Sequence, residues 1–177
     1  MREHVQTLAL LDVDVVEVKT PGQLAKVDAL VLPGGESTTI SKLSEIFGMY
    51  EPIKAAIAAG LPTLGTCAGL IMLGEIADPA SGQKSFGGLD VTVTRNAFGN
   101  QNDSFEADLE VAGITGLVHA AFIRAPIVSR VGPGVDVLAQ LADGRVVGVK
   151  QGKVIGISFH PEVTGETRIH QLLVDLI

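Results

Sequence analysis

Cys67 is the residue of this chain whose type and setting point most directly to covalent chemistry. It lies in the run Gly65-Thr66-Cys67-Ala68-Gly69, between an apolar segment typical of a strand and another typical of a helix. A nucleophile with glycines at this spacing indicates a nucleophile elbow, a tight turn that leaves no room for neighbouring side chains. Amide N–H groups at the start of the helix would favour the thiolate. The alternative is an inert thiol, because most unpaired intracellular cysteines are small core residues.

His160 and Glu162 could supply the base that such a thiol needs. They follow the apolar run 154–158 and are separated by Pro161. Neutral imidazole can take a proton from a thiol and return it to a leaving group near neutral pH. In an extended chain, residues two apart point to the same side. We therefore expect Glu162 to orient His160 as the third member of a triad. The alternative is a histidine at a strand end, beside a solvated carboxylate.

The three other histidines, His4, His119 and His170, are weaker candidates for the base. His4 and His170 fall on predicted amphipathic helices, and His119 has no partner pattern around it. We expect each of them to be structural or exposed.

A glycine-rich loop at residues 33–39, with the sequence PGGESTT, follows one predicted strand and opens a helix. Its glycines would let the backbone approach a ligand closely. The amides of Gly35 and Ala68 could together bind a developing oxyanion. Ser37 could instead cap the helix. A phosphate loop is not indicated, because no Gly-Lys-Ser or Gly-Lys-Thr sequence follows.

Two arginines are candidates for binding a carboxylate. Arg95 follows one predicted strand, in Arg95-Asn96-Ala97-Phe98-Gly99, and Arg124 ends another, in 122–126. The planar guanidinium suits a carboxylate. Either arginine could equally form an ordinary surface ion pair.

The elements that must position these residues alternate between helix and strand in the first part of the chain. Alternation of this kind predicts a parallel sheet with helices on its faces. From residue 89 onward, apolar and polar residues alternate instead, which predicts antiparallel or mixed strands. The sequence thus predicts one α/β domain over residues 1–177. The predicted helices are 2–11, 37–47, 51–59, 68–76 and 165–177, and the predicted strands are 13–18, 28–32, 63–66, 89–94, 105–111, 117–123, 135–141, 145–150 and 154–159.

Composition excludes several classes of function. A net charge of −7 and an aromatic content of 4% argue against a nucleic-acid groove. No segment approaches the roughly 20 apolar residues of a membrane span, and the start of the chain lacks the pattern of a signal peptide. A single cysteine allows neither an internal disulfide nor a cysteine-based metal site, which fits the cytoplasm.

The combined motifs resemble the glutaminase subunits of pyridoxal 5′-phosphate synthase, within the class I glutamine amidotransferases. The Gly-x-Cys-x-Gly and His-x-Glu pieces resemble class I amidotransferases in general. The runs GGESTT, RNAFG and FIRAP are more specific to the glutaminase subunits, and they occur in the family's order along nearly the whole chain.

This resemblance implies a flavodoxin-like α/β fold, with a mixed sheet, helices on both faces and neither metal nor cofactor. It implies that Cys67, His160 and Glu162 hydrolyse L-glutamine to L-glutamate and ammonia through a γ-glutamyl thioester. The ammonia would pass to a (β/α)₈-barrel synthase subunit, in a large hetero-oligomer that makes pyridoxal 5′-phosphate. The residues implied to contact glutamine are Gly35, Glu36, Ser37, Arg95, Ile123 and Arg124.

Two alternatives remain beside this interpretation. The triad would also suit the amidotransferase domain of another pathway. Members of the family begin with an apolar strand carrying a Leu-Gln-Gly run, and the printed chain starts at the helix that follows it. We therefore expect a sheet that lacks this strand and leaves neighbouring strands unpaired. A non-catalytic subunit that only docks to a synthase is the second alternative.

Overall fold

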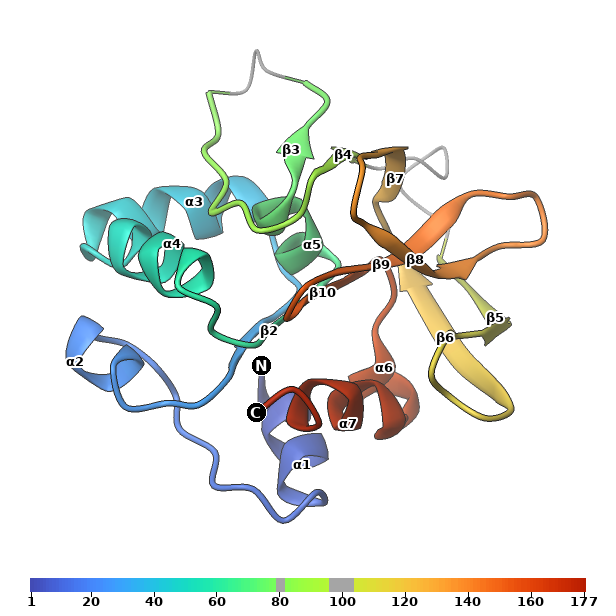
Figure 1. Ribbon diagram of the computed structural model, residues 1–177, viewed down its shortest axis with the longest axis horizontal. Helices are drawn as coiled ribbons and strands as arrows, with labels where there is room; N and C mark the ends of the chain where they lie inside the picture. Colours follow the sequence, from blue (N-terminus) through green and yellow to red (C-terminus); the bar gives the residue numbers. More distant parts are fainter. Residues whose placement is uncertain (79–81, 96–103) are drawn as a thin grey trace.

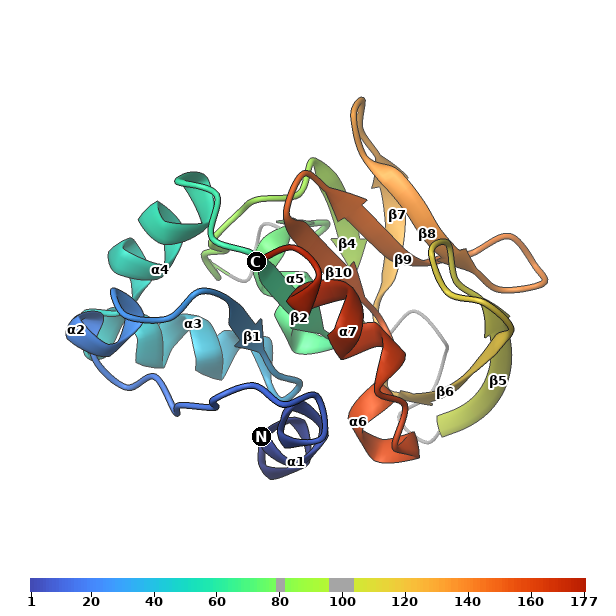
Figure 2. The same ribbon diagram turned by 60° about the horizontal axis from the view of Figure 1, so that its bottom comes forward.

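A mixed sheet passes through the centre of the protein, with helices on both of its faces (Figures 1 and 2). The computed structural model describes residues 1–78, 82–95 and 104–177. The strand order is β1-β2-β10-β9-β7-β4-β3, and β8 pairs with β9. β1, β2 and β10 are parallel, whereas β9 runs antiparallel to β10. The strands of this sheet are β1 (Leu30–Leu32), β2 (Thr63–Thr66), β3 (Glu75–Ile76), β4 (Val91–Thr94), β7 (Ile127–Val131), β8 (Asp136–Gln140), β9 (Val146–Gln151) and β10 (Val154–Ile157).

Helices cover the parallel part of the sheet from two sides, and a separate antiparallel hairpin joins β5 (Ser104–Glu110) to β6 (Leu117–Ile123). The helices α3, α4 and α5 lie on one side of the sheet, and α1 and α7 lie on the other (Figure 1). The helices are α1 (Arg2–Ala9), α2 (Pro21–Leu24), α3 (Ser37–Ile46), α4 (Tyr50–Ala58), α5 (Ala68–Leu73), α6 (Pro161–Thr164) and α7 (Arg168–Val174).

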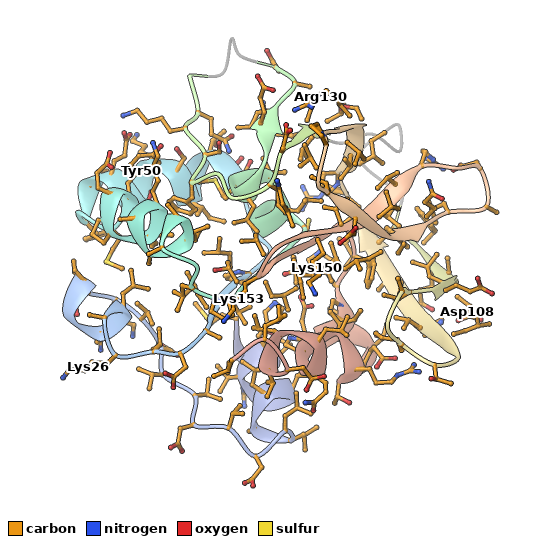
Figure 3. The ribbon with its side chains drawn as sticks, in the orientation of Figure 1. Lys26, Tyr50, Asp108, Arg130, Lys150 and Lys153 are labelled. Carbon is orange, nitrogen blue, oxygen red and sulfur yellow. The ribbon has the colours of Figure 1, made fainter. Side chains whose placement is uncertain are left out.

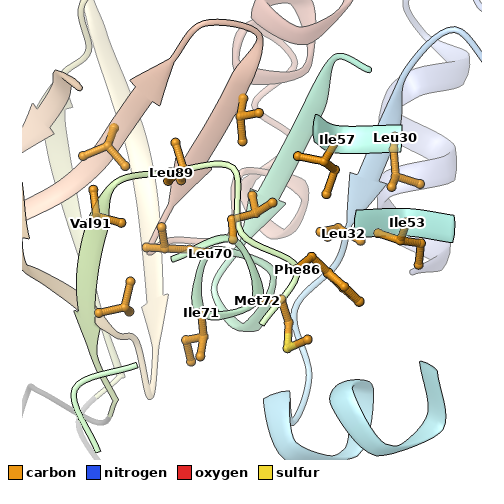
Figure 4. Close-up of a cluster of buried hydrophobic side chains, with 14 of the residues drawn as sticks. Leu30, Leu32, Ile53, Ile57, Leu70, Ile71, Met72, Phe86, Leu89 and Val91 are labelled. Atoms are coloured by element: carbon orange, nitrogen blue, oxygen red, sulfur yellow. The ribbon is translucent and has the colours of Figure 1, made fainter. Parts of the chain in front are cut away.

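The two faces of the sheet carry two hydrophobic clusters. One cluster contains Leu70 and Met72 of α5, packed with residues of β1, α4 and β4 (Figure 4). The other contains Ile155 and Ile157 of β10, packed against Leu173 of α7. Successive residues of a strand point to opposite faces. Each apolar side chain of this size stabilises the folded state by about 1.5–3 kcal/mol when fully buried. Both clusters therefore stabilise the packing of the helices on the sheet.

Most of the predicted elements are confirmed, with boundaries moved by a few residues. The predicted strand over 13–18 is wrong, since residues 13–19 carry no secondary structure. Val16 is exposed, and no described strand pairs with this segment. A short apolar run becomes a strand only where a neighbour accepts its backbone hydrogen bonds.

The predicted helix over 68–76 ends early, at Leu73. Gly74 is extended, with φ −104° and ψ −176°, and β3 follows at once. A Cβ at Gly74 would lie 2.8 Å from side-chain atoms of both Val91 and Val93, so the chain passes tightly over β4 here. The sequence pattern also missed β7 and the short helices α2 and α6.

Charged side chains such as Lys26, Asp108 and Arg130 lie at the periphery (Figure 3). None of the helices formed by the described residues combines the length and the apolar character needed to cross a membrane.

Candidate active site

Cys67 occupies a strained turn between β2 and α5. Its backbone has φ 51° and ψ −104°, a conformation that costs an L residue about 1–3 kcal/mol. The flanking positions must be glycine because a side chain at either one would collide with neighbouring backbone atoms. A Cβ at Gly65 would lie 2.6 Å from the backbone of Gly69, and a Cβ at Gly69 would lie 2.1 Å from the carbonyl oxygen of Leu32. The strand-to-helix elbow predicted from the glycine spacing is therefore confirmed.

Parallel pairing of β2 with β10 brings His160 to this turn. Thr66 lies opposite Ile157 in the register, and the amide of Cys67 donates to the carbonyl of Ile157 at 2.8 Å. His160 follows β10, and its amide donates to the carbonyl of Ala121 at 2.9 Å. Its imidazole lies near enough to Cys67 for the thiol side chain to raise the pKa of His160.

The other ring nitrogen of His160 faces Glu162. Nδ1 of His160 lies 2.8 Å from Oε1 of Glu162. The backbone conformation that brings His160 and Glu162 together differs from the extended one expected. His160 is the N-cap of α6, and Glu162 belongs to the first turn of that helix. The extended geometry expected for 160–162 is wrong, because Pro161 starts a helix, a position that proline suits.

Burial and hydrogen bonding set the charges of this pair. Burial alone would lower the pKa of His160, but hydrogen bonds with Cys67 and Glu162 raise it to about 9. Burial alone would raise the pKa of Glu162, but hydrogen bonds from His160 and His4 hold it well below the ordinary value. The arrangement therefore favours a carboxylate and an imidazolium beside the sulfur of Cys67.

The glycine-rich loop lies against the imidazole of His160. A Cβ at Gly34 would lie 2.6 Å from Cε1 of that ring, so only glycine allows this approach. Gly35 has φ 145°, a conformation that favours glycine. Ala68 begins α5, and an amide in the first turn has no partner within its own helix.

Glu36, rather than Ser37, caps helix α3. Its carboxylate accepts hydrogen bonds from the amides of Thr38 at 3.2 Å and Thr39 at 2.7 Å, and from both threonine hydroxyls. These bonds, that from the Thr38 side chain foremost, lower the pKa of Glu36 to about 2. The alternative role for Ser37, capping the helix, is therefore wrong.

Ser37 and Arg95 share a partner that the sequence pattern missed. The hydroxyl of Ser37 and Nη1 of Arg95 lie 3.2 Å and 3.3 Å from Oε1 of Gln83. Arg95 also lies 3.9 Å from a carboxylate oxygen of Asp78. The structure thus connects two of the predicted glutamine contacts through Gln83, which belongs to none of the motifs found in the sequence.

The end of β6 reaches the nucleophile through its main chain. Sγ of Cys67 lies 3.9 Å from the carbonyl oxygen of Ile123. Arg124 follows with φ 45°, a strained conformation for this residue type, and its side chain is exposed. The structure therefore places the predicted contact residue Ile123 beside Cys67 and Arg124 next to it.

Two of the remaining histidines are buried on helices, which agrees with the structural role expected for them. His4 and His170 are 3% and 0% exposed, and Nε2 of His4 lies 3.3 Å from Oε1 of Glu162. Sequence periodicity could not reveal this contact, because the three residues come from three helices. His119 is exposed on β6, as expected for a residue outside the site, and pairs with Asp108 and Glu106.

The site combines a cysteine at a strand-to-helix turn, a histidine after the neighbouring parallel strand and a carboxylate beside that histidine. A comparison with known families adds a match over the full chain. The pattern of the SNO glutamine amidotransferase family matches residues 1–177. The chain belongs to the SNO glutamine amidotransferase family. This finding confirms the class I glutamine amidotransferase resemblance drawn from the motifs.

Individual members and a solved structure agree with the SNO assignment. The chain is 53% identical to "Pyridoxal 5′-phosphate synthase subunit PdxT" of Streptomyces avermitilis, covering 100% of this chain and 89% of that protein. It is also 53% identical to the protein of the same name from Parafrankia sp., covering 100% and 88%. A structure described as "Crystal structure of glutamine amidotransferase" superposes with a TM-score of 0.92 at 45% identity, over 99% of this chain and 92% of that one.

Proposed function

We propose that residues 1–177 form one glutaminase domain that hydrolyses L-glutamine to L-glutamate and ammonia, and that the ammonia serves the synthesis of pyridoxal 5′-phosphate. Two observations carry the reaction: Cys67 raises the pKa of the neighbouring His160, and the ring of His160 lies 2.8 Å from the carboxylate of Glu162. The synthetic context is supported by the names of relatives that are 53% identical.

The reaction begins with the thiolate of Cys67, whose proton is held by His160. The sulfur attacks the carboxamide carbon of glutamine, and the carbonyl oxygen becomes an oxyanion that the amides of Gly35 and Ala68 stabilise. Collapse of this intermediate breaks the C–N bond, and His160 gives its proton to the departing ammonia. The product on the enzyme is a γ-glutamyl thioester.

Water completes the cycle by attacking the thioester. His160 takes a proton from this water, and glutamate leaves as the thiolate re-forms. Glu162 stabilises the imidazolium in both halves of the reaction. Gly35, Glu36, Ser37, Arg95, Ile123 and Arg124 form the glutamine site, in which we assign a guanidinium to the α-carboxylate. Because the carboxylate of Glu36 is engaged in capping, we assign its role to holding the loop in shape.

The partner in this proposal is a (β/α)₈-barrel synthase subunit in a large hetero-oligomer, which receives the ammonia. A single catalytic thiol must stay reduced, so we place the complex in the cytoplasm. Transfer to a partner avoids the loss of ammonia to solvent.

The test is glutamate release by Cys67→Ala and His160→Asn, measured with and without the synthase subunit. Both variants are expected to lose turnover, while Cys67→Ala still binds glutamine. The matched control is His119→Asn, which removes a histidine held between two carboxylates on the exposed face of β6 and is expected to keep full activity. Turnover by Cys67→Ala would refute the proposal, and an inactive wild-type complex would favour a docking subunit.

A further inference from the structure

A second pair of imidazoles lies buried behind the carboxylate of Glu162. His4 comes from α1 and His170 from α7, and Nδ1 of His4 lies 2.9 Å from Nε2 of His170. Nε2 of His4 lies 3.3 Å from Oε1 of Glu162 and 3.2 Å from the hydroxyl oxygen of Thr66. Oε1 of Glu162 therefore has an imidazole nitrogen on each side, one from His160 and one from His4.

The hydrogen positions follow from which atoms can accept. The carboxylate of Glu162 only accepts, so a hydrogen bond between these two groups requires the hydrogen on Nε2 of His4. Burial foremost, together with the charge of His4, lowers the pKa of His170 to about 4, so His170 is neutral near pH 7. Nδ1 of His170 is buried, and the geometry of the described residues gives it no hydrogen-bond partner. Nδ1 of His4 lies within hydrogen-bond distance of Nε2 of His170, so one of these two nitrogens donates to the other.

Helix α1 contributes polar side chains to the interior at this contact. Its buried residues are His4 and Thr7, with no fully buried apolar side chain. In Figures 1 and 2, α1 lies beside the C-terminal helices that carry Glu162 and His170. An apolar residue would attach a surface helix at a lower desolvation cost. A histidine at this position places a ring nitrogen beside the carboxylate of Glu162 instead.

We propose that His4 is a positioning residue for the glutaminase reaction, which donates from Nε2 to Oε1 of Glu162 and holds that carboxylate where it orients His160, while His170 holds the imidazole of His4 in place. This inference rests on the proposed function. Partners behind a catalytic or metal-binding group commonly change activity by about 10- to 100-fold when removed. His4 itself touches no reacting atom.

The test compares His4→Gln with His4→Asn in the full chain, assayed with the synthase subunit. The amide nitrogen of glutamine can occupy the place of Nε2, whereas that of asparagine corresponds to Nδ1 and falls short of Glu162. We expect His4→Asn to lower kcat by roughly 10- to 100-fold with little change in KM, and His4→Gln to recover most of it. When Glu162→Gln is already present, adding His4→Asn should lower kcat little further, because both substitutions disrupt the same contacts from His4 through Glu162 to His160.

A second readout separates this inference from the glutaminase assignment. The rate at which iodoacetamide alkylates Cys67, followed against pH, reports the thiolate–imidazolium pair without any turnover. His4→Asn should shift this profile, and His4→Gln should leave it near that of the wild type. Wild-type kcat and an unshifted profile in His4→Asn would overturn the role of His4. If His4→Asn shifts the alkylation profile but the wild-type protein never hydrolyses glutamine, the role of His4 stands and the glutaminase function alone is overturned.

Discussion

At the scale of single residues, this site combines backbone strain with buried charge. Cys67 is held at a positive φ, and Glu162 is an ionised carboxylate with one oxygen, Oε2, buried and unpaired among the described residues. Both features cost stability. They persist because the surrounding strands and helices hold the residues in place. A substitution at these residues can therefore abolish activity without unfolding the chain.

His170 predicts a pH dependence of stability at this scale. Its pKa is about 4 in the folded protein and near the ordinary 6.5 when unfolded. Between these values the unfolded chain binds more protons, so the free energy of unfolding falls as the pH drops from 6.5 to 4. The full contribution is about 3 kcal/mol. Urea unfolding at several pH values should show this slope, and His170→Gln should flatten it; an equal slope in both proteins would contradict the prediction.

At the scale of elements, the close approach of α5 to β1 fixes the turn that carries the buried Cys67. The Cβ that Gly69 lacks would lie 2.1 Å from a backbone oxygen of β1. Backbone atoms in a paired strand cannot move as a flexible side chain can. Helix α5 can therefore keep its position only with glycine here.

Gly69→Ala is predicted to destabilise the protein by about 2 kcal/mol or more, as overpacking of a tight contact does, and to reduce glutamine turnover by moving Cys67. Chemical unfolding and a glutaminase assay on the same sample would measure both effects. The matched control is Gly22→Ala in α2, where an added Cβ meets no atom within 4 Å. The control should be neutral or slightly stabilising, since alanine favours helix. Equal stability of the two variants would count against the contact.

At the scale of the whole molecule, the candidate site depends on elements from distant parts of the chain. The sheet brings β2 beside β10, and β6 supplies the carbonyl next to Cys67. A ligand bound across these elements stabilises all of them together.

Glutamine should therefore raise the melting temperature of Cys67→Ala, which binds the substrate without consuming it. At 100 times its Kd, a ligand contributes about 2.7 kcal/mol, which corresponds to about 5–10 °C for a domain of this size. Differential scanning fluorimetry would measure the shift, with glutamate and asparagine as comparison ligands. No shift at any attainable glutamine concentration would contradict the placement of the site.

Much of the candidate site was predictable because its signals are local. The elbow glycines stand within two residues of Cys67, and His160 and Glu162 are two apart at a strand end. Strand and helix periodicity predicted β2 and β6 with their observed bounds and most other elements within a few residues. The predicted strand at 13–18 failed because strand formation depends on a neighbour, which no local pattern specifies.

The sequence by itself indicated the candidate nucleophile, its candidate base and the carboxylate beside that base from short local motifs, and it predicted the α/β class from the alternation of helices and strands along the chain. Only the tertiary structure decided that Glu162 reaches His160 from a helical turn, that Gln83 joins Ser37 to Arg95, and that His4 and His170 meet behind the carboxylate. The two histidines are 166 positions apart. A contact across that separation is made by the packing of α1 against α6 and α7, and packing leaves no periodic trace in either segment.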